Sequence, residues 1–154
     1  MRLLSKHVLF FFLLLALFSA CGTYSEEEKK SFEEKINDVI SENNWSMERL
    51  ENGLYFQIIE QGEGELIKLT DVVSFAYKGS FIDGEVFQTI PVDDPVTFPV
   101  RSLIAGWQDA LSLIGNQGKI RIIVPPHLGY GNKETGIIPA NSILIYELEV
   151  VAIA

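Results

Sequence analysis

Apolar and polar residues follow two different periods along the chain. Residues 53–62, 71–81, 118–126 and 141–153 are rich in aromatic and β-branched side chains, and the last of these segments alternates apolar with polar residues. Such segments are typical of β-strands. Residues 103–119 instead place apolar side chains at helical spacing, which predicts one short amphipathic helix. Several antiparallel strands with a single helix between them indicate an α+β fold.

One face of the predicted helix collects its apolar side chains, which are Ile104, Trp107, Leu111 and Ile114. The Gly-Asn pair at 115–116 is expected to end the helix, because both residues tolerate the left-handed conformation that is common at helix ends. Burial habits alone favour a core position for Trp107. Whether Trp107 also borders a ligand site depends on the rest of the chain.

A second helix is predicted near the N-terminus, after a short tether at residues 22–25. Glu28 follows Ser25 three residues later, which predicts a capping box, and acidic residues are favourable in a first helical turn. The apolar stripe of this helix is narrow and consists of Phe32, Ile36, Val39 and Ile40. We expect the helix to rest this stripe on the domain. The alternative is a helix that dimerises or binds a partner.

The first residues have the features of a lipoprotein signal peptide. A basic start precedes the apolar run at 8–20, which is too short to span a bilayer because a span needs about 20 residues. Small residues then precede Cys21, the only cysteine of the chain, although Phe18 stands where lipidation sites prefer Leu. We predict a signal peptide over 1–20 and a lipid on Cys21. Because two or more acyl chains anchor stably, the protein would be a membrane lipoprotein of the cell envelope, periplasm-facing or exposed on the outer membrane.

Charge and histidine count exclude several chemistries. The formal net charge is −9, and an acidic surface repels phosphate backbones, so nucleic-acid binding is not expected. After the signal peptide, His127 is the only histidine, so neither a metal site nor a hydrolytic triad is expected. The pair Asp93 and Asp94 lies between Pro91 and Pro95, which indicates a turn. No cofactor is implied, and the chemistry that remains is aromatic and apolar.

Four stretches stand in order along the chain: FAYKGSFIDGEVF at 75–87, LIAGWQDAL at 103–111, PPHLGYG at 125–131 and GIIPANSILIYELEV at 136–150. Together they resemble the FKBP-type peptidyl-prolyl cis-trans isomerase family. The resemblance covers about residues 52 to 152 and implies a bent antiparallel β-sheet wrapped around one short α-helix.

The domain organisation follows from the resemblance and the signal peptide. Residues 1–20 are the predicted signal peptide, and residues 21–51 are a lipidated tether with an acidic amphipathic helix. Residues 52–154 are the predicted isomerase domain.

The resemblance implies that Trp107 forms the floor of an apolar pocket for proline. The side chains that it implies for catalysis are Tyr77, Phe87, Trp107 and Tyr130. Those that it implies for substrate binding are Leu103, Ile104, Ile138, Tyr146, Gln88 and Val96. By the same resemblance, the backbone N–H of Ile104 and the hydroxyl of Tyr130 would donate hydrogen bonds to substrate carbonyls.

Two pocket positions depart from the family pattern. Gln88 stands where the family usually has Asp, and Val96 stands where it commonly has Phe. A neutral Gln can still accept a hydrogen bond from Tyr77, but a bond to a neutral group is weaker than one to a carboxylate. We therefore expect a reduced isomerase activity and a reduced affinity for macrolides.

The leading hypothesis is a lipid-anchored prolyl isomerase, or rotamase, that acts on X-Pro bonds of envelope proteins and assists their folding. Its partners would be proline-containing polypeptides, a membrane reached through the lipid anchor, and macrolide ligands. The alternative is a weakly active or non-catalytic module that binds proline-containing partners in a membrane-associated machine. A third hypothesis is a structural lipoprotein whose aromatic residues are only core. Some lipoproteins of this family are associated with gliding motility, but no residue of this chain establishes that role.

Overall fold

The computed structural model describes residues 24–154. The predicted signal peptide and Cys21 lie outside these residues. The described part of the chain contains two α-helices, α2 (Glu26–Glu42) and α3 (Ala105–Leu111), and two single turns of 3₁₀ helix at Val100–Ser102 and Pro126–Leu128. Neither α2 nor α3 is long and apolar enough to cross a membrane.

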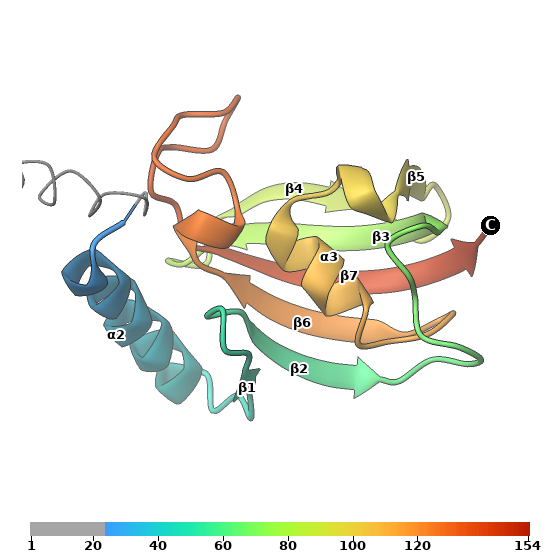
Figure 1. The fold of residues 1–154 in the computed structure, drawn as a ribbon, viewed down its shortest axis with the longest axis horizontal. Helices are drawn as coiled ribbons and strands as arrows, with labels where there is room; N and C mark the ends of the chain where they lie inside the picture. Colours follow the sequence, from blue (N-terminus) through green and yellow to red (C-terminus); the bar gives the residue numbers. More distant parts are fainter. Residues whose placement is uncertain (1–23) are drawn as a thin grey trace, which may run out of the picture.

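An antiparallel sheet of seven strands forms the body of the described region (Figure 1). The strands are β1 (Glu48–Arg49), β2 (Tyr55–Glu60), β3 (Val72–Phe81), β4 (Val86–Ile90), β5 (Val96–Pro99), β6 (Lys119–Val124) and β7 (Leu144–Ile153). They lie in the order β1-β2-β6-β7-β3-β4, and β5 pairs with β3. The sheet bends around α3, and α2 lies outside it. The predicted α+β fold, with a bent sheet around one short helix and an N-terminal helical extension, is confirmed.

The central helix is shorter than predicted. It ends at Leu111, whereas the sequence predicted a helix over 103–119. Ile114 is buried, as predicted, but it lies beyond the helix, and its carbonyl accepts a hydrogen bond from the N–H of Ile67 at 3.0 Å. The next residue donates its own N–H to the carbonyl of Gln61 at 2.9 Å. These tertiary hydrogen bonds take the place of helical ones, so the helix stops before the Gly-Asn pair.

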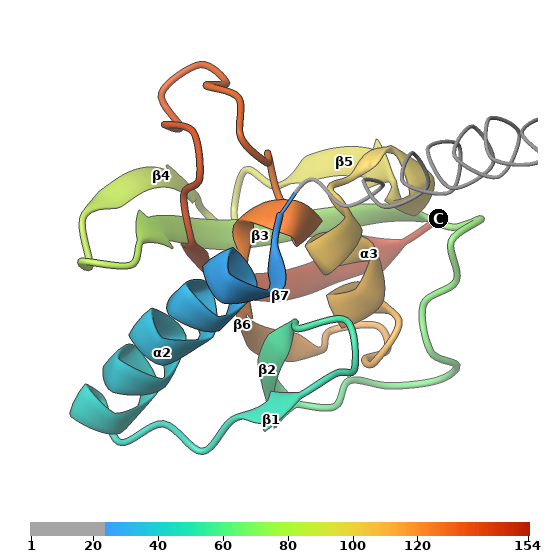
Figure 2. The same ribbon diagram turned by 60° about the vertical axis from the view of Figure 1, so that its left-hand side comes forward.

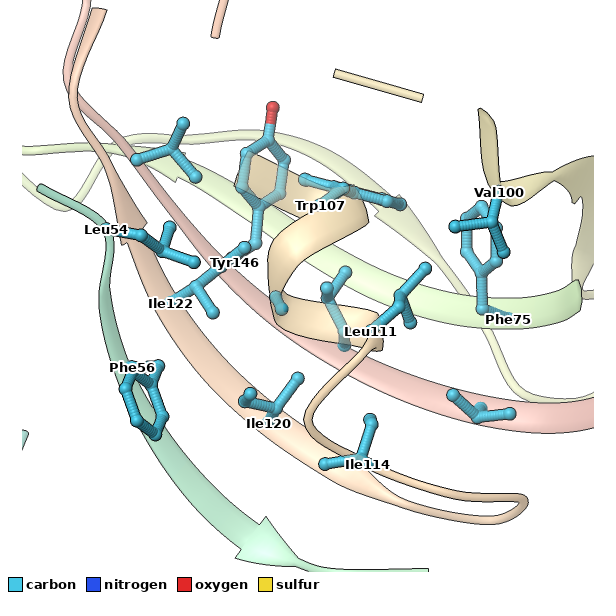
Figure 3. Packing of buried hydrophobic residues seen from close by; sticks show 14 of the residues in the cluster. Leu54, Phe56, Phe75, Val100, Trp107, Leu111, Ile114, Ile120, Ile122 and Tyr146 are labelled. Carbon is cyan, nitrogen blue, oxygen red and sulfur yellow. The ribbon is translucent and has the colours of Figure 1, made fainter. Parts of the chain in front are cut away.

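Strand alternation divides the core into two layers, one on each face of the sheet. On β6, Ile122 belongs to the layer under α3, whereas its neighbour Ile123 belongs to the layer under α2. On β7, Tyr146 and Ile145 are divided in the same way. Figure 3 shows the larger layer between α3 and the sheet. Because side chains of a strand alternate between its two faces, helices that cover both faces require apolar residues at consecutive positions.

The N-terminal helix packs on the second, smaller layer. The predicted capping box is present, since the N–H of Glu28 donates to Ser25 Oγ at 3.2 Å and the N–H of Ser25 donates to Glu28 Oε2 at 2.8 Å. Ile36 is only 1% exposed, and the rest of the predicted stripe packs against the same layer. The expectation that the helix rests this stripe on the domain is confirmed.

The prediction that residues 22–25 form a tether is wrong at Tyr24. The side chain of Tyr24 is 5% exposed, and its ring meets that of Phe32 edge-on with centroids 5.3 Å apart. Its hydroxyl donates a hydrogen bond to Asn141 Oδ1 at 2.8 Å. Figure 2 shows this start of α2, in blue, beside the orange segments that lead toward β7. The chain is therefore attached to the domain already at Tyr24.

Replacing Ile36 tests whether α2 is part of the cooperative fold. Ile36→Ala is expected to lower the free energy of unfolding by about 2–5 kcal/mol, because it leaves a cavity in a buried layer. Urea denaturation of the full chain measures this change. Lys35→Ala, at an exposed position of the same helix, is the matched control and should change stability by no more than about 0.5 kcal/mol. Equal stability of the Ile36→Ala protein and the wild type would contradict the packing of α2.

Candidate functional site

A cavity of about 670 Å³ lies between α3, strands β3, β4 and β5, and the loop before β7. Each residue that the sequence predicted for catalysis or substrate binding borders it: Tyr77, Phe87, Gln88, Val96, Leu103, Ile104, Trp107, Tyr130, Ile138 and Tyr146. The structure therefore brings together side chains that are spread over positions 77 to 146 of the sequence.

Trp107 forms the floor of the cavity because α3 lies very close to β6. A Cβ atom on Gly106 would lie 2.8 Å from Val124 Cγ1, so a larger residue would push the helix and the strand apart. The neighbouring Trp107 is 6% exposed, and its ring meets those of Tyr77 and Tyr146 edge-on, with centroids 4.9 and 5.0 Å apart. Such edge-to-face contacts are favourable. Figure 3 shows Trp107 and Tyr146 at the upper end of the core.

A second glycine brings two residues of the wall together. Gly79 lies on β3, and a Cβ atom there would lie 2.6 Å from Phe87 Cζ and 2.9 Å from Tyr146 Cε1. Because position 79 has no side chain, the rings of Phe87 and Tyr146 meet edge-on with centroids 5.9 Å apart. Sequence reasoning did not assign this role to Gly79, although the Tyr-x-Gly spacing that starts at Tyr77 was the available signal.

The polar groups of the cavity are few, and none of its lining side chains carries a charge at neutral pH. Ile104 is the N-cap of α3, and its carbonyl accepts a hydrogen bond from the N–H of Trp107 at 3.0 Å. Its own N–H has no hydrogen-bond partner among residues 24–154. At the rim, Tyr130 is 38% exposed. The cavity thus offers one unpaired backbone donor and an accessible phenol on a surface that consists largely of aromatic and aliphatic side chains.

Burial raises the pKa of two tyrosines in the cavity. The pKa of Tyr146 is raised far above its ordinary value, chiefly because burial disfavours the phenolate and to a lesser extent because of Tyr130 and Tyr77. The pKa of Tyr77 is raised for the same main reason. Both hydroxyls therefore stay protonated at physiological pH, and neither can serve as a general base.

Gln88 and Val96 border the cavity, but the wall differs from the one expected. The hydrogen bond from Tyr77 to Gln88 that the sequence suggested is absent within the described region; Ile90 is the strand partner of Tyr77, and Gln88 pairs with Gly79. Gln88 is exposed at the edge. Phe98 lies two residues after Val96 on the same face of β5 and also borders the cavity. Phe98 therefore supplies aromatic surface that Val96 lacks.

Sequence reasoning missed further residues of the wall, which are Phe75, Ile90, Phe98, Ser102, Thr135, Gly136 and Ile137. Phe75 and Phe98 could have been found, since each lies two residues from a predicted wall residue on the same strand face. Residues 135–137 lie in a loop, where no periodic pattern of the sequence predicts which side chains face the cavity.

His127, Asp93 and Asp94, for which the sequence predicted no role in metal binding or catalysis, do not border the cavity. His127 Nε2 is 2.7 Å from the carbonyl oxygen of Asn52. Asp94 donates its N–H to the carbonyl of Pro91 at 3.2 Å, so the predicted turn at Asp93 and Asp94 is confirmed. Across the described residues, no group of three or more His, Cys, Asp or Glu side chains could hold a metal ion.

Comparison with known proteins identifies the family of this chain. A model of the family described as FKBP-type peptidyl-prolyl cis-trans isomerase matches residues 63–151. The chain belongs to the FKBP-type peptidyl-prolyl cis-trans isomerase family.

Several relatives and solved structures are similar to this chain. The isomerase FkpA of Buchnera aphidicola subsp. Schizaphis graminum is 42% identical over 104 residues, which cover 66% of this chain and 41% of the relative. FkpA of Escherichia coli strain K12 is 39% identical over 98 residues, which cover 63% and 36%. The crystal structure of FkpA from Escherichia coli gives a TM-score of 0.69 at 29% identity over 82% of this chain and 62% of that chain. The chain spans about two fifths of the length of the curated relatives it matches.

Replacing Trp107 tests its place on the cavity floor. Trp107→Ala is expected to lower the free energy of unfolding by about 3–5 kcal/mol, because it removes a large side chain that packs against the core on one side and borders the cavity on the other. Thermal and urea unfolding of the full chain measure this loss. If the variant were as stable as the wild type, Trp107 could not be the buried floor residue.

Proposed function

We propose that this protein is a peptidyl-prolyl cis-trans isomerase that acts on X-Pro bonds of polypeptides. The observation that carries the proposal is the cavity, which combines an aromatic floor, walls without charged side chains and one unpaired backbone N–H at Ile104. Membership of the isomerase family supports the same conclusion. The family as a whole binds proline-containing substrates and macrolide ligands, so we expect a macrolide to compete for this cavity.

The proposed mechanism needs no nucleophile and no general base. Rotation about a peptide bond meets a barrier of about 20 kcal/mol because amide resonance must be broken, and for X-Pro bonds the exchange takes about tens to hundreds of seconds. The planar amide is the more charge-separated form and the better hydrated one. An apolar cavity that excludes water therefore disfavours the planar amide relative to the twisted one, which lowers the barrier.

The residues of the cavity divide into two roles in this mechanism. Trp107, Tyr77 and Phe87 would surround the proline ring, and Leu103, Ile138, Val96 and Tyr146 would complete the apolar surface around it. The N–H of Ile104 and the hydroxyl of Tyr130 would donate to the carbonyls on either side of the rotating bond. Donors that bind these carbonyls more tightly in the twisted geometry would accelerate rotation.

A second candidate function is the binding of proline-containing partners with little or no turnover. The observation that favours it is Gln88, which is neutral, exposed and not bonded to Tyr77. A cavity edge without a fixed polar group would bind an X-Pro segment but stabilise the twisted amide less.

A protease-free isomerisation assay on short X-Pro peptides tests the proposed activity. The wild-type protein is expected to accelerate exchange, and Tyr130→Phe is expected to lower kcat/KM by about two- to tenfold, because it removes one hydrogen bond worth about 0.5–1.5 kcal/mol. The stability of Tyr130→Phe should equal that of the wild type, since the rim residue is exposed. Peptide binding without turnover in the wild type would instead favour the binding module, and the absence of both would contradict both candidates.

We further infer that the protein acts in the cell envelope on envelope polypeptides. The proposed organisation is a signal peptide at 1–20, a lipid on Cys21 followed by the acidic helix within 21–51, and the isomerase domain at 52–154. The basis of this inference is the N-terminal sequence, with its basic start, its short apolar run and its single cysteine.

Replacing Cys21 tests the anchor. Cys21→Ser is expected to abolish labelling by fatty acid and to leave an uncleaved or soluble form, because only the thiol accepts the lipid. Metabolic labelling and membrane fractionation of cells that produce the two forms measure the change. Normal labelling and membrane retention of Cys21→Ser would rule out a lipid on this residue.

A further inference from the structure

The segment before α2 is tied to the loop that forms the outer wall of the cavity. Tyr24 is fixed on one side by its contact with Phe32 of α2 and on the other by its hydrogen bond to Asn141 Oδ1. The two ends of that hydrogen bond are 117 positions apart in the sequence. A buried hydroxyl bonded to a loop side chain restricts where the loop can lie.

Asn141 is the residue that closes this loop. It adopts a left-handed backbone conformation with φ of 61°, and its N–H donates to the carbonyl of Gly131 at 2.9 Å. Gly131 in turn donates its N–H to the carbonyl of Pro126 at 2.9 Å. These bonds hold the base of the loop, and the neighbour of Gly131 in the chain is Tyr130, the proposed donor to the substrate.

The same loop carries the outer wall of the cavity. Thr135 and Ile138 exchange backbone hydrogen bonds of 2.9 and 3.0 Å, which form a small hairpin at residues 135–138. All of these residues border the cavity. Only Ile138 is buried against the core, whereas Ile137 is exposed. The position of the hairpin therefore depends on its base at Gly131 and Asn141.

We propose that Tyr24 is a positioning residue of the cavity: its hydroxyl holds Asn141, and through Asn141 it holds the loop 131–141 and the adjacent Tyr130. The N-terminal segment then contributes to substrate binding without touching substrate. The kinetic part of this inference rests on the proposed isomerase function, whereas the placement of the loop does not. Loss of the Tyr24 hydroxyl allows the loop to leave the position described above for a larger fraction of the time.

The test compares Tyr24→Phe, Asn141→Gly and their double variant in the full chain, purified in detergent. Tyr24→Phe keeps the ring and its contact with Phe32, and Asn141→Gly keeps a residue that readily adopts positive φ. Tyr55→Phe is the matched control, because the Tyr55 hydroxyl also joins a strand to α2, through Glu33 Oε1 at 3.3 Å, but does not reach the loop.

Amide hydrogen exchange and peptide kinetics give independent readouts. Exchange at Ile138, referred to amides of β7, should rise about two- to tenfold in each single variant, and KM should rise by a similar factor with a smaller change in kcat. Loop exchange and KM of the double variant should not exceed those of the more affected single variant, because the two substitutions remove the same hydrogen bond. Tyr55→Phe should leave loop exchange and KM unchanged.

Each result decides a separate claim. Unchanged loop exchange in Tyr24→Phe, or an equal rise in Tyr55→Phe, would overturn the coupling between Tyr24 and the loop. Raised exchange with an unchanged KM would overturn the role in substrate binding. If the wild-type protein turns over no peptide, the proposed isomerase function fails, and the exchange data still decide whether Tyr24 holds the loop.

Discussion

The close approach of α3 to β6 at Gly106 determines where Trp107 lies, and the whole cavity depends on Trp107. A Cβ atom on Gly106 would lie 2.8 Å from Val124 Cγ1, and the ring of the neighbouring Trp107 is only 6% exposed beside this contact. Tyr77 and Tyr146 then pack against the edges and face of that ring. The floor of the cavity is therefore also the top of the core, so the stability of the fold and the proposed substrate binding would rely on the same aromatic contacts.

The proposed chemistry depends on what the cavity excludes as much as on what it contains. A charged side chain near the rotating amide would bring water with it, and water favours the planar amide through hydration. The residues that border the cavity carry no such charge, and the raised pKa of Tyr146 keeps its phenol neutral. The unpaired N–H of Ile104 is a fixed donor that brings no charge into this surface.

The parts of the structure that could be predicted are those set by local sequence. Runs of aromatic and β-branched residues indicated β2, β3, β6 and β7, and the Ser25 and Glu28 pair indicated the start of α2. The residues of the cavity were implied by the family resemblance of four ordered motifs. Two features could not be predicted, because each depends on residues far away in the sequence. Hydrogen bonds to residues 61–67 set the end of α3, and Asn141 accepts the hydrogen bond of the buried Tyr24 hydroxyl.

Strand β7 contributes side chains to both layers of the core. It therefore connects the N-terminal helix on one face of the sheet with the cavity on the other. Tyr146 faces the cavity, whereas the neighbouring Ile145 faces α2. Ile143 lies on the α2 side at the point where the loop from Asn141 enters the strand. A shift of α2 therefore acts on the same few residues that end the loop and begin the cavity wall. Because packed interiors transmit strain, these neighbouring residues of β7 are the route through which the proposed coupling between α2 and the cavity would act.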